Sequence, residues 1–392
     1  MHDVIVIGAG PAGSMTARRL ADRGHDVLLL EEHEAVGRPV HCTGLLGTEA
    51  FEEFALPRDV ILGRAVAARF WGAAGQSVPV GAGSVHASII DRALLDERLA
   101  AQAVAAGATL RTGCRVDRLT SEGRSVQVGV RGLDGPILGR AAVLACGANY
   151  RFHRQLGLGL PDLFLQSAQL EVPFPLVPEV EVRFGREVAP AGFAWLVPVP
   201  RVDGPHARIG LMSETRSLQR FGRFAASLWD RAGLPPAAPL RPRLKILPLG
   251  PVPRTYGHRL LAVGDAAGLV KPTTGGGIYY GLLSGSIAAT VLADGLRQDR
   301  LDGAFLRRYE RQWRRRLGQE IRMGLAFRRV VAGLTDESID TLIDLARTSG
   351  LVPLLEQTAS FNWHRKAAVA LLGHPSFRRV VLKSWAGASG PA

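Results

Sequence analysis

A glycine-rich turn close to the N-terminus constrains the fold more than any other part of the chain. It lies in "VIVIGAGPAGSMTARRLADRGHDVLLLEE" (4–32), whose apolar start predicts a strand buried on both faces. Three glycines follow at GxGxxG spacing, namely Gly8, Gly10 and Gly13. A helical stretch to about Arg23 and a second apolar strand ending on Glu31 complete the pattern. This order of strand, helix and terminal acid predicts a βαβ unit that binds a dinucleotide.

Each part of this unit has a physical role in binding a dinucleotide. The first glycine permits a tight turn, the second lets the backbone approach a pyrophosphate, and the third lets the helix pack closely on the strand. The helix N-terminus offers free N–H donors and a partial positive charge to the phosphates. A carboxylate at the end of the second strand accepts hydrogen bonds from ribose hydroxyls. Glu31 is preferred for that role, and Glu32 is the alternative.

Two later segments favour FAD over NAD as the dinucleotide. The strand–helix pattern breaks off near residue 37 and resumes at "RAAVLACGA" (140–148) and "RLLAVGDAAG" (259–268), which suits a larger cofactor held by distant segments. Asp265 then ends a late strand of the nucleotide domain, where its carboxylate accepts a hydrogen bond from a ribityl hydroxyl. The helix that starts near Gly276 directs its N-terminus at the pyrimidine edge of a flavin, where negative charge develops on reduction.

Several stretches resemble a known group of flavoproteins. "GAGPAG…LLLEE", "IIDRALLDERLAAQAVAAGATL", "AAVLACGANYRFHRQLG" and "GDAAGLVKPTTGGGIYYGLLSG" together resemble the glutathione-reductase-type FAD fold of aromatic hydroxylases and their relatives. Within that group the chain most resembles the geranylgeranyl reductase family, which includes the archaeal-type digeranylgeranylglycerophospholipid reductases. "GRPVHCTGLL" (37–46) is similar to that family's Pro–x–x–Cys loop near the flavin, and "GFAWLVPVP" (192–200) to its aromatic–x–Trp–x–x–Pro motif lining the substrate cavity. The similarity covers residues 1–300.

The resemblance implies an α/β fold and a reductase activity. A Rossmann-like FAD-binding domain of glutathione-reductase type is expected over 1–60, 86–160 and 250–300. An inserted antiparallel β-sheet substrate domain is expected over 61–85 and 161–249, and a C-terminal helical region over 301–392. The implied activity is hydride transfer from reduced FAD to carbon–carbon double bonds of a geranylgeranyl-type isoprenoid chain, part of lipid biosynthesis.

The fingerprint and the resemblance together define the expected site. The expected FAD contacts are Gly8, Gly10, Ala12, Gly13, Glu31, Glu32, Arg38, Cys42, Arg92, Gly264, Asp265, Gly275, Gly276, Gly277 and Ile278. The expected substrate wall is Phe193, Trp195 and Pro198, and Pro198 and Pro200 are expected to end their strand. Cys42 is the candidate catalytic residue, facing the flavin and positioning substrate or relaying a proton. No metal site is expected.

Each of these assignments competes with an ordinary structural role. A free cysteine such as Cys42 is commonly a small buried hydrophobe. Phe193 and Trp195 share one face of their strand, which also suits plain core packing. Arg92 begins an amphipathic helix, so its charge is otherwise a solvated helix terminus. Four further candidates near the flavin have similar alternatives: His41, His86, Tyr279 and Tyr280.

Two departures from the hydroxylase pattern affect the electron donor and the reaction. Cys146–Gly147 replaces an Asp–Gly pair that engages the flavin pyrophosphate and the nicotinamide donor in those enzymes, and no second GxGxxG follows a strand. Direct use of NADPH is therefore in doubt, and ferredoxin or another electron-donor protein is the alternative. A monooxygenase acting on an apolar small molecule is the alternative reaction. Its halogenase form is disfavoured because Phe193 occupies the first tryptophan position of the halogenase motif, with no lysine nearby.

The charge of the chain favours anionic partners. The formal net charge is +13, nearly all of it from arginine. Residues 304–331 carry apolar side chains at four-residue intervals amid dense arginine, which predicts a helix that rests on an anionic membrane or packs on the FAD domain. Residues 332–392 are expected to be helical, with no assigned role. No nucleic-acid-reading module accompanies the charge, so nucleic acid is not an expected partner.

The same sequence predicts a cytoplasmic protein. Its three cysteines are far apart and none forms a CxxC pair, which fits a reducing compartment. No signal peptide and no uninterrupted apolar run of about 18 residues is visible. Association with a membrane is therefore expected to be peripheral at most, through contact with its surface.

Overall fold

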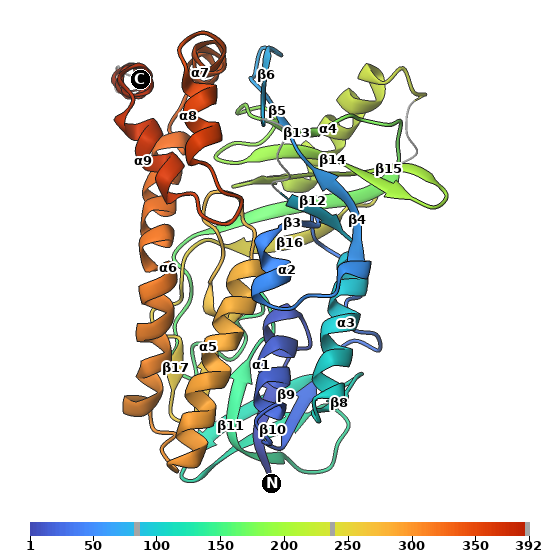
Figure 1. The fold of residues 1–392 in the computed structure, drawn as a ribbon, viewed down its shortest axis with the longest axis vertical. Coiled ribbons are helices and arrows are strands. Elements are labelled where there is room, and N and C mark those ends of the chain that lie inside the picture. The colour runs from blue at the N-terminus through green and yellow to red at the C-terminus, as the bar shows by residue number, and fades with distance from the viewer. Residues whose placement is uncertain (82–86, 236–239, 389–392) are drawn as a thin grey trace.

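Two large sheets and a set of helices form the molecule (Figure 1). The computed structural model describes residues 1–81, 87–235 and 240–388. An eight-stranded sheet occupies the lower half of Figure 1, and a seven-stranded sheet lies above it. The expected α/β architecture, with a dinucleotide-type sheet, a second sheet and C-terminal helices, is confirmed.

The eight-stranded sheet brings four strand ends to one edge. Its strands are β1 (His2–Ile7), β2 (Val27–Leu30), β8 (Thr109–Arg111), β9 (Val116–Glu122), β10 (Ser125–Val130), β11 (Ile137–Leu144), β17 (Tyr256–Gly257) and β18 (Leu260–Ala262). β1 pairs in parallel with β2 and β11, and β11 with β18. Ile7 lies opposite both Leu30 and Leu144, and Leu144 lies opposite Ala262. The segments that follow these residues, including the glycine turn and Asp265, therefore begin at neighbouring points.

Close helix packing fixes the two helix N-termini at this edge. Helices α1 (Pro11–Ala21) and α5 (Ile278–Arg297) lie side by side in Figure 1, and α3 (Arg92–Ala105) packs on α1. A Cβ on Gly13 would come within 1.9 Å of the Gly8 carbonyl oxygen, and one on Gly285 within 2.5 Å of the Ala12 oxygen. A larger residue at either position would push the backbones apart, so these glycines set the distances of α1 from the sheet and from α5.

The seven-stranded sheet lies on the other side of the functional site from the eight-stranded sheet. Its order is β16 (Arg243–Pro248), β12 (Phe164–Pro173), β15 (Gly204–Ser213), β14 (Phe193–Arg201), β13 (Val180–Arg183), β5 (Ala68–Trp71) and β6 (Ser77–Val80). Neighbouring strands are antiparallel except for β13 and β5, which are parallel. Helix α4 (Ser217–Arg231) covers one face with Phe221, Phe224 and Leu228. The opposite face is left to line the site.

The expectation that two prolines end strand β14 is wrong. The strand runs from Phe193 to Arg201, and Pro198 and Pro200 pair opposite Ala207 and Pro205 of β15. On its other side β14 pairs with β13 only as far as Leu196. Beyond that point one side of β14 is an edge, where a proline without an N–H group costs no ladder hydrogen bond.

A three-stranded sheet connects the two large ones. It contains β3 (Leu45–Gly47), β7 (Ala87–Ile90) and β4 (Ile61–Ala65), and α2 (Glu49–Glu53) follows β3. The β4 strand lies in the part of the chain assigned above to the substrate domain, and it pairs with β7. The loop that carries Cys42 runs directly into β3, so this small sheet fixes the end of that loop.

The C-terminal part is a long helix followed by four shorter ones. These are α6 (Gly303–Ala332), α7 (Asp336–Thr348), α8 (Leu351–Thr358), α9 (Arg365–Gly373) and α10 (Pro375–Ala388). The predicted stripe on α6 is buried and comprises Phe305, Tyr309, Trp313, Leu317 and Ile321. The Tyr309 hydroxyl donates to the Ala262 carbonyl at 2.8 Å, which ties α6 to β18. The apolar stripe of this helix therefore packs inward, and contact of its arginines with a membrane stays a prediction.

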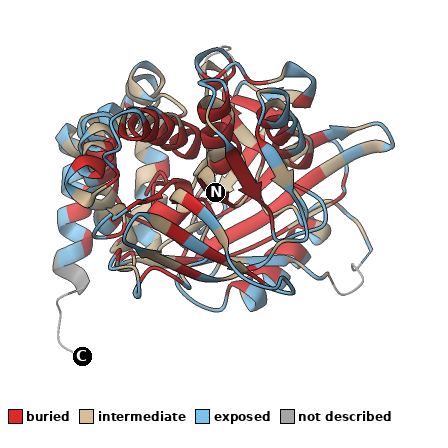
Figure 2. Ribbon diagram, turned by 90° about the horizontal axis from the view of Figure 1, so that it is seen from below, coloured by how far each residue is buried: buried red, intermediate tan, exposed pale blue. Residues whose placement is uncertain are grey.

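The burial pattern follows the layers. Figure 2 shows buried residues where sheets and helices face one another, and exposed residues on the outer faces of the helices. Among the helices of the described residues, none is both long enough and apolar enough to cross a membrane.

Candidate functional site

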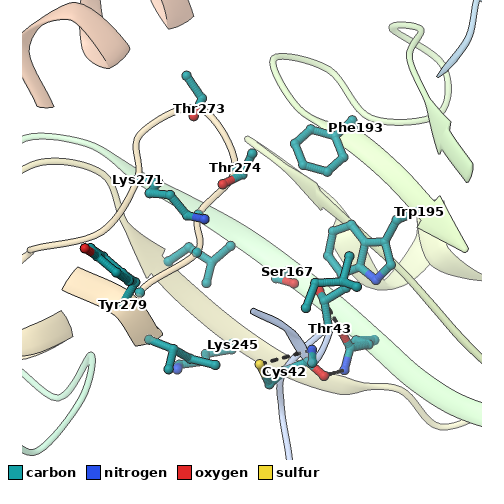
Figure 3. Close-up of a pocket in the computed structure, with 18 of the residues that line it drawn as sticks. Cys42, Thr43, Ser167, Phe193, Trp195, Lys245, Lys271, Thr273, Thr274 and Tyr279 are labelled. Atoms are coloured by element: carbon teal, nitrogen blue, oxygen red, sulfur yellow. Dashed lines mark hydrogen bonds between the residues drawn. The ribbon is translucent and has the colours of Figure 1, made fainter. Parts of the chain in front are cut away.

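A cavity of about 1250 Å³ is lined by both large sheets and by the C-terminal helices. Pockets for one small ligand typically measure roughly 300–1,000 Å³. The cavity is therefore large enough for a cofactor together with a second molecule. Figure 3 shows Lys271, Thr273 and Thr274 on one side of it and Phe193 and Trp195 on the other, with Cys42 and Thr43 below them in the view.

The glycine turn at the end of β1 has the form of a dinucleotide cradle. Gly8 adopts a φ of 108°, and a Cβ there would lie 2.4 Å from the Ala145 oxygen. A Cβ on Gly10, by contrast, would meet no atom within 4 Å. Gly10 is the N-cap of α1 and lines the cavity, so the space beside it suits the approach of a phosphate to free helix N–H groups. The residues present thus fit FAD at this end.

The two acids at the end of β2 differ in environment. Glu31 is buried, and its Oε2 accepts a hydrogen bond from the Ala9 N–H at 2.9 Å. Its Oε1 accepts from the His33 N–H at 3.1 Å. Glu32 is exposed, although it too lines the cavity. Glu31 is thus held against the glycine turn, which suits the ribose role assigned to it, and that role stays a prediction.

Arg92 and Cys42 lie beside each other at the cavity wall. The Arg92 guanidinium donates to both carboxylate oxygens of Asp96 at 2.9 and 2.8 Å. Burial opposes the charge of Arg92, but the Asp96 carboxylate and the neighbouring Cys42 sulfur outweigh it and raise the pKa of Arg92. The Cys42 Sγ accepts from the Gly44 N–H at 3.3 Å, and the Cys42 carbonyl accepts from Gln169 Nε2 at 2.8 Å. Two predicted residues far apart in sequence therefore meet here.

Asp265 connects the two large sheets at the wall of the same cavity. Its Oδ2 lies 3.3 Å from Lys245 Nζ on β16, and its Oδ1 would lie 2.3 Å from a Cβ on Gly277. Gly277 is the N-cap of α5 and lines the cavity with Gly275, Gly276 and Ile278. The carboxylate and the helix N-terminus therefore occupy one corner, as the flavin interpretation requires, although their contacts with a ribityl chain and a ring stay predictions.

The aromatic wall comes from alternate residues of β14. The rings of Phe193 and Trp195 lie 5.9 Å apart, and both line the cavity. A Cβ on Gly210 of the neighbouring strand would lie 2.5 Å from the indole, so that glycine makes room for Trp195. Pro198 does not line the cavity. Strand alternation turns it to the face of Ala194 and Leu196, so its placement in the substrate wall is corrected.

The remaining predicted residues are more scattered. The Arg38 side chain is 68% exposed and lies 4.0 Å from Glu97 at the cavity rim. His41 lines the cavity, and burial lowers its pKa to about 4, so its ring is neutral. Tyr279 lines the cavity and donates its hydroxyl to Glu53, whereas Tyr280 is buried in the core. His86 lies outside the described residues.

Two groups of lining residues are not found by reading the sequence. The segment beyond residue 332, which has no role assigned from the sequence, covers one end of the cavity with Leu334, Ile339, Leu342, Leu351, Leu355 and Phe377. Lys245 and Lys271 also line it, brought there from segments distant from Phe193. The chain has only four lysines, at 245, 271, 366 and 383, and Lys271 interrupts an apolar stretch. A lysine is therefore unusual in this chain, and its place in an apolar stretch is the sequence signal that indicates a role for Lys271.

Comparisons with known proteins agree with this geometry. The family model described as FAD dependent oxidoreductase matches residues 3–56, and the model described as Lycopene cyclase protein matches residues 230–342. Digeranylgeranylglycerophospholipid reductase 2 of Methanothermobacter thermautotrophicus is 34% identical over 87% of this chain and 91% of its own length. Digeranylgeranylglycerophospholipid reductase of Methanocaldococcus jannaschii is 28% identical over 88% and 90%.

Solved structures share the fold. A geranylgeranyl bacteriochlorophyll reductase-like protein from Thermoplasma acidophilum superposes with a TM-score of 0.83 at 23% identity, covering 97% of this chain and 98% of that one. The halogenase PltM in complex with phloroglucinol and FAD gives a TM-score of 0.69 at 16% identity, covering 99% and 93%. The first of these has the higher structural similarity.

Proposed function

The chain belongs to the digeranylgeranylglycerophospholipid reductase family of FAD-dependent oxidoreductases, and we propose that it reduces carbon–carbon double bonds of a geranylgeranyl-type isoprenoid chain. One observation carries the proposal. The strand ends that suit FAD and the aromatic wall of β14 line one continuous cavity, which extends under the apolar C-terminal helices. A long apolar chain placed along that wall would reach the cofactor without leaving an apolar environment.

The residues of this chain bind and orient the reactants. When bound and reduced, FAD would supply the hydride for one carbon of the double bond. Phe193 and Trp195 hold the chain in place over the cofactor loop, and the apolar side chains of the helices exclude water. Lys245, paired with Asp265, keeps the carboxylate at the cavity wall. The protein's share of catalysis is therefore mainly positioning in a dry site.

The second hydrogen is a proton, and Cys42 is our candidate for its source. The Cys42 Sγ carries the proton beside the Arg92 guanidinium, and Gln169 and Gly44 fix the position of the loop. Loss of the proton to the second carbon leaves a thiolate next to that guanidinium, where the charge is compensated. The thiol is regenerated by a proton from solvent once the product has left the site. A bound water at Cys42 is the alternative carrier.

Electrons reach FAD from an external donor, for which NADPH and ferredoxin are both candidates. Cys146, in the position of the hydroxylase acid, lines the cavity, and its thiol donates to the Asn149 carbonyl at 3.2 Å. Burial raises the pKa of Cys146 to about 12, so this position offers no negative charge. A donor protein such as ferredoxin is therefore preferred over direct reaction with NADPH.

We also propose contact with the surface of an anionic membrane, where a lipid substrate is dissolved, on the cytoplasmic side. Residues 357–392 contain no aspartate or glutamate. The exposed face of α10 carries Arg378, Arg379 and Lys383 around Leu382, which is 61% exposed. Phe377 of the same helix lines the cavity, so the basic surface adjoins the end of the proposed substrate path.

Anaerobic turnover tests the function directly. Dithionite-reduced protein is incubated with geranylgeranyl lipids, and mass spectrometry follows the gain of one H₂ per reduced bond. Products with such gains are the expected result. Rapid oxygen uptake with NADPH and insertion of oxygen into an apolar small molecule would instead favour the monooxygenase alternative. Reduced protein that no isoprenoid lipid reoxidises would overturn the proposal.

A further inference from the structure

Lys271 is a buried lysine on the cavity wall for which the reaction above has no use. Its residue is 5% exposed, and its Nζ donates to the Phe361 carbonyl at 2.9 Å and to Asn362 Oδ1 at 3.2 Å. The Nζ also lies 4.3 Å from the centroid of the Phe361 ring. Within the described residues it forms no ion pair. Burying an ammonium whose direct partners are all neutral costs free energy of folding, which suggests a functional role for Lys271.

The ammonium is packed against the loop expected to lie along the flavin. The Lys271 N–H donates to the Gly276 carbonyl at 3.0 Å, and its own carbonyl accepts from the Gly275 N–H at 2.8 Å. A Cβ on Gly276 would come within 2.8 Å of Lys271 Cε and 3.4 Å of Nζ. The lysine therefore closes the loop whose last residue, Gly277, is the N-cap of α5.

The surroundings of Lys271 leave its positive charge largely uncompensated. Burial lowers the pKa of Lys271 to about 7, and the distant Glu49 carboxylate only partly opposes that effect. Glu49 is reached through Asn362, whose Nδ2 donates to it at 2.8 Å. The partial positive charge of the α5 N-terminus adds to the cost of the ammonium.

The other ionisable groups around this loop do not supply the missing negative charge. They are Asp265, which is paired with Lys245; His364, joined to Thr273; Tyr279 and Tyr280 on α5; and Arg328 on α6, which donates to the Pro272 carbonyl at 3.0 Å. Burial and the Lys271 charge lower the pKa of His364 to about 4, so that ring is neutral. Burial raises the pKa of both tyrosines, so they too are neutral.

We propose that Lys271 is a tuning residue for the bound flavin: its ammonium stabilises the negative charge that reduction places on the ring beside Gly275–Gly277. Two-electron reduction adds two electrons and one proton to the ring and leaves it with one negative charge. Where the lysine is neutral beforehand, its amine takes one further proton from solvent. Reduction and protonation of Lys271 are then coupled, and the buried charge gains its partner only when the cofactor is loaded with electrons.

Redox titration against pH tests the coupling. Two-electron reduction of the wild-type protein is expected to take up one more proton above about pH 7 than below it, because Lys271 is then neutral before reduction. Lys271→Met should lose this extra proton and lower the midpoint potential, whereas Lys271→Arg should retain the higher potential. Sulfite adds to the ring of oxidised flavin and leaves negative charge there, so its affinity should fall by about tenfold or more in Lys271→Met. Lys366→Met, at an exposed lysine, is the matched control.

A merely structural role for Lys271 predicts a different pattern. Asn362→Ala removes one partner of the ammonium but keeps the charge, so it should lower thermal stability and preserve the pH dependence of the potential. If Lys271→Met binds FAD and matches the wild type in both potential and sulfite affinity, the inference is wrong. These readouts need no substrate, so they can fail or succeed independently of the proposed lipid reduction.

Discussion

Lys245 and Asp265 form an ion pair across the two large sheets, with 3.3 Å between Nζ and Oδ2. Lys245 belongs to β16, and Asp265 follows β18, so the pair joins the seven-stranded sheet to the eight-stranded sheet. Asp265→Ala should weaken FAD binding by about tenfold to a hundredfold, because hydrogen bonds to a charged group contribute about 1.5–3 kcal/mol. Lys245→Met keeps the Asp265 carboxylate and should weaken FAD binding less than Asp265→Ala does. Fluorescence titration of the cofactor-free protein measures both, and full affinity in Asp265→Ala would contradict the assignment.

The glycine turn offers a matched pair of variants. Gly13→Ala forces a Cβ to within 1.9 Å of the Gly8 oxygen, so it should destabilise the fold by about 1–3 kcal/mol even without cofactor. Gly10→Ala meets no protein atom within 4 Å and should leave cofactor-free stability unchanged while weakening FAD binding. Thermal unfolding and FAD titration of both proteins separate the two effects. Equal loss of stability in both would show that Gly10 is structural.

Strand alternation on β14 gives a second pair. Phe193 lines the cavity and Pro198 does not. Phe193→Ala should raise the KM for an isoprenoid lipid by about tenfold, because about 1–2 kcal/mol of apolar burial is lost. Pro198→Ala should leave KM unchanged. Steady-state assays with one lipid suffice, and the reverse ranking would mean that the chain runs along the other face of the strand.

Stability in acid should depend on the ion pairs that hold the Cys42 loop. Arg208 donates to Glu171 at 2.7 Å and to the Thr43 carbonyl at 3.1 Å. Burial opposes the charge of Glu171, but hydrogen bonds from Arg201 and Arg208 outweigh it and hold the pKa of Glu171 below its ordinary 4.5. A carboxylate with a depressed pKa in the folded state stabilises the fold at pH values above its unfolded-state pKa. This stabilisation is lost as the pH falls through the folded-state pKa.

The wild type should therefore be more stable than Glu171→Gln at neutral pH, with the difference shrinking as the pH falls below about 4.5. Denaturant unfolding at several pH values measures that difference. The contributions of the carboxylates that both proteins share cancel in the difference. A constant difference across the range would remove Glu171 as the titrating group.

Membrane contact is tested with vesicles of defined charge. Arg379→Glu with Lys383→Glu should reduce co-sedimentation with anionic vesicles, because each basic residue near such a surface contributes about 1 kcal/mol. Arg131→Glu, an exposed arginine in the turn between β10 and β11, is the control and should bind as the wild type does. Binding that is equally strong on zwitterionic vesicles would argue against an electrostatic surface.

The residues at the cofactor end of the site belong to short local motifs, so they can be predicted from the sequence. The GxGxxG turn, the acid after β2 and the Asp265 segment each follow a buried strand, and parallel pairing brings such ends together. The proximity of Cys42 to Arg92 depends on tertiary packing of a loop, so spacing alone does not give it. The position of α7, α8 and α10 over the cavity does not follow from the sequence, because an apolar helix face has the same residue pattern whether it meets a core or a cavity. Pro198 departs from the motif because strand alternation places it on the opposite face of β14 from Phe193 and Trp195.

The length of α6 has a consequence for how such enzymes diversify. Its first half is anchored on the eight-stranded sheet through Tyr309, and its far end leads into the helices that cover one end of the cavity. Replacing everything beyond residue 332 with the matching piece of a relative would exchange the cover, provided that the new piece keeps the Phe361 and Asn362 contacts with Lys271. Chimeras joined at that point are therefore a route to altered chain-length preference, and inheritance of the tail as a unit would let one flavoprotein body serve different lipids.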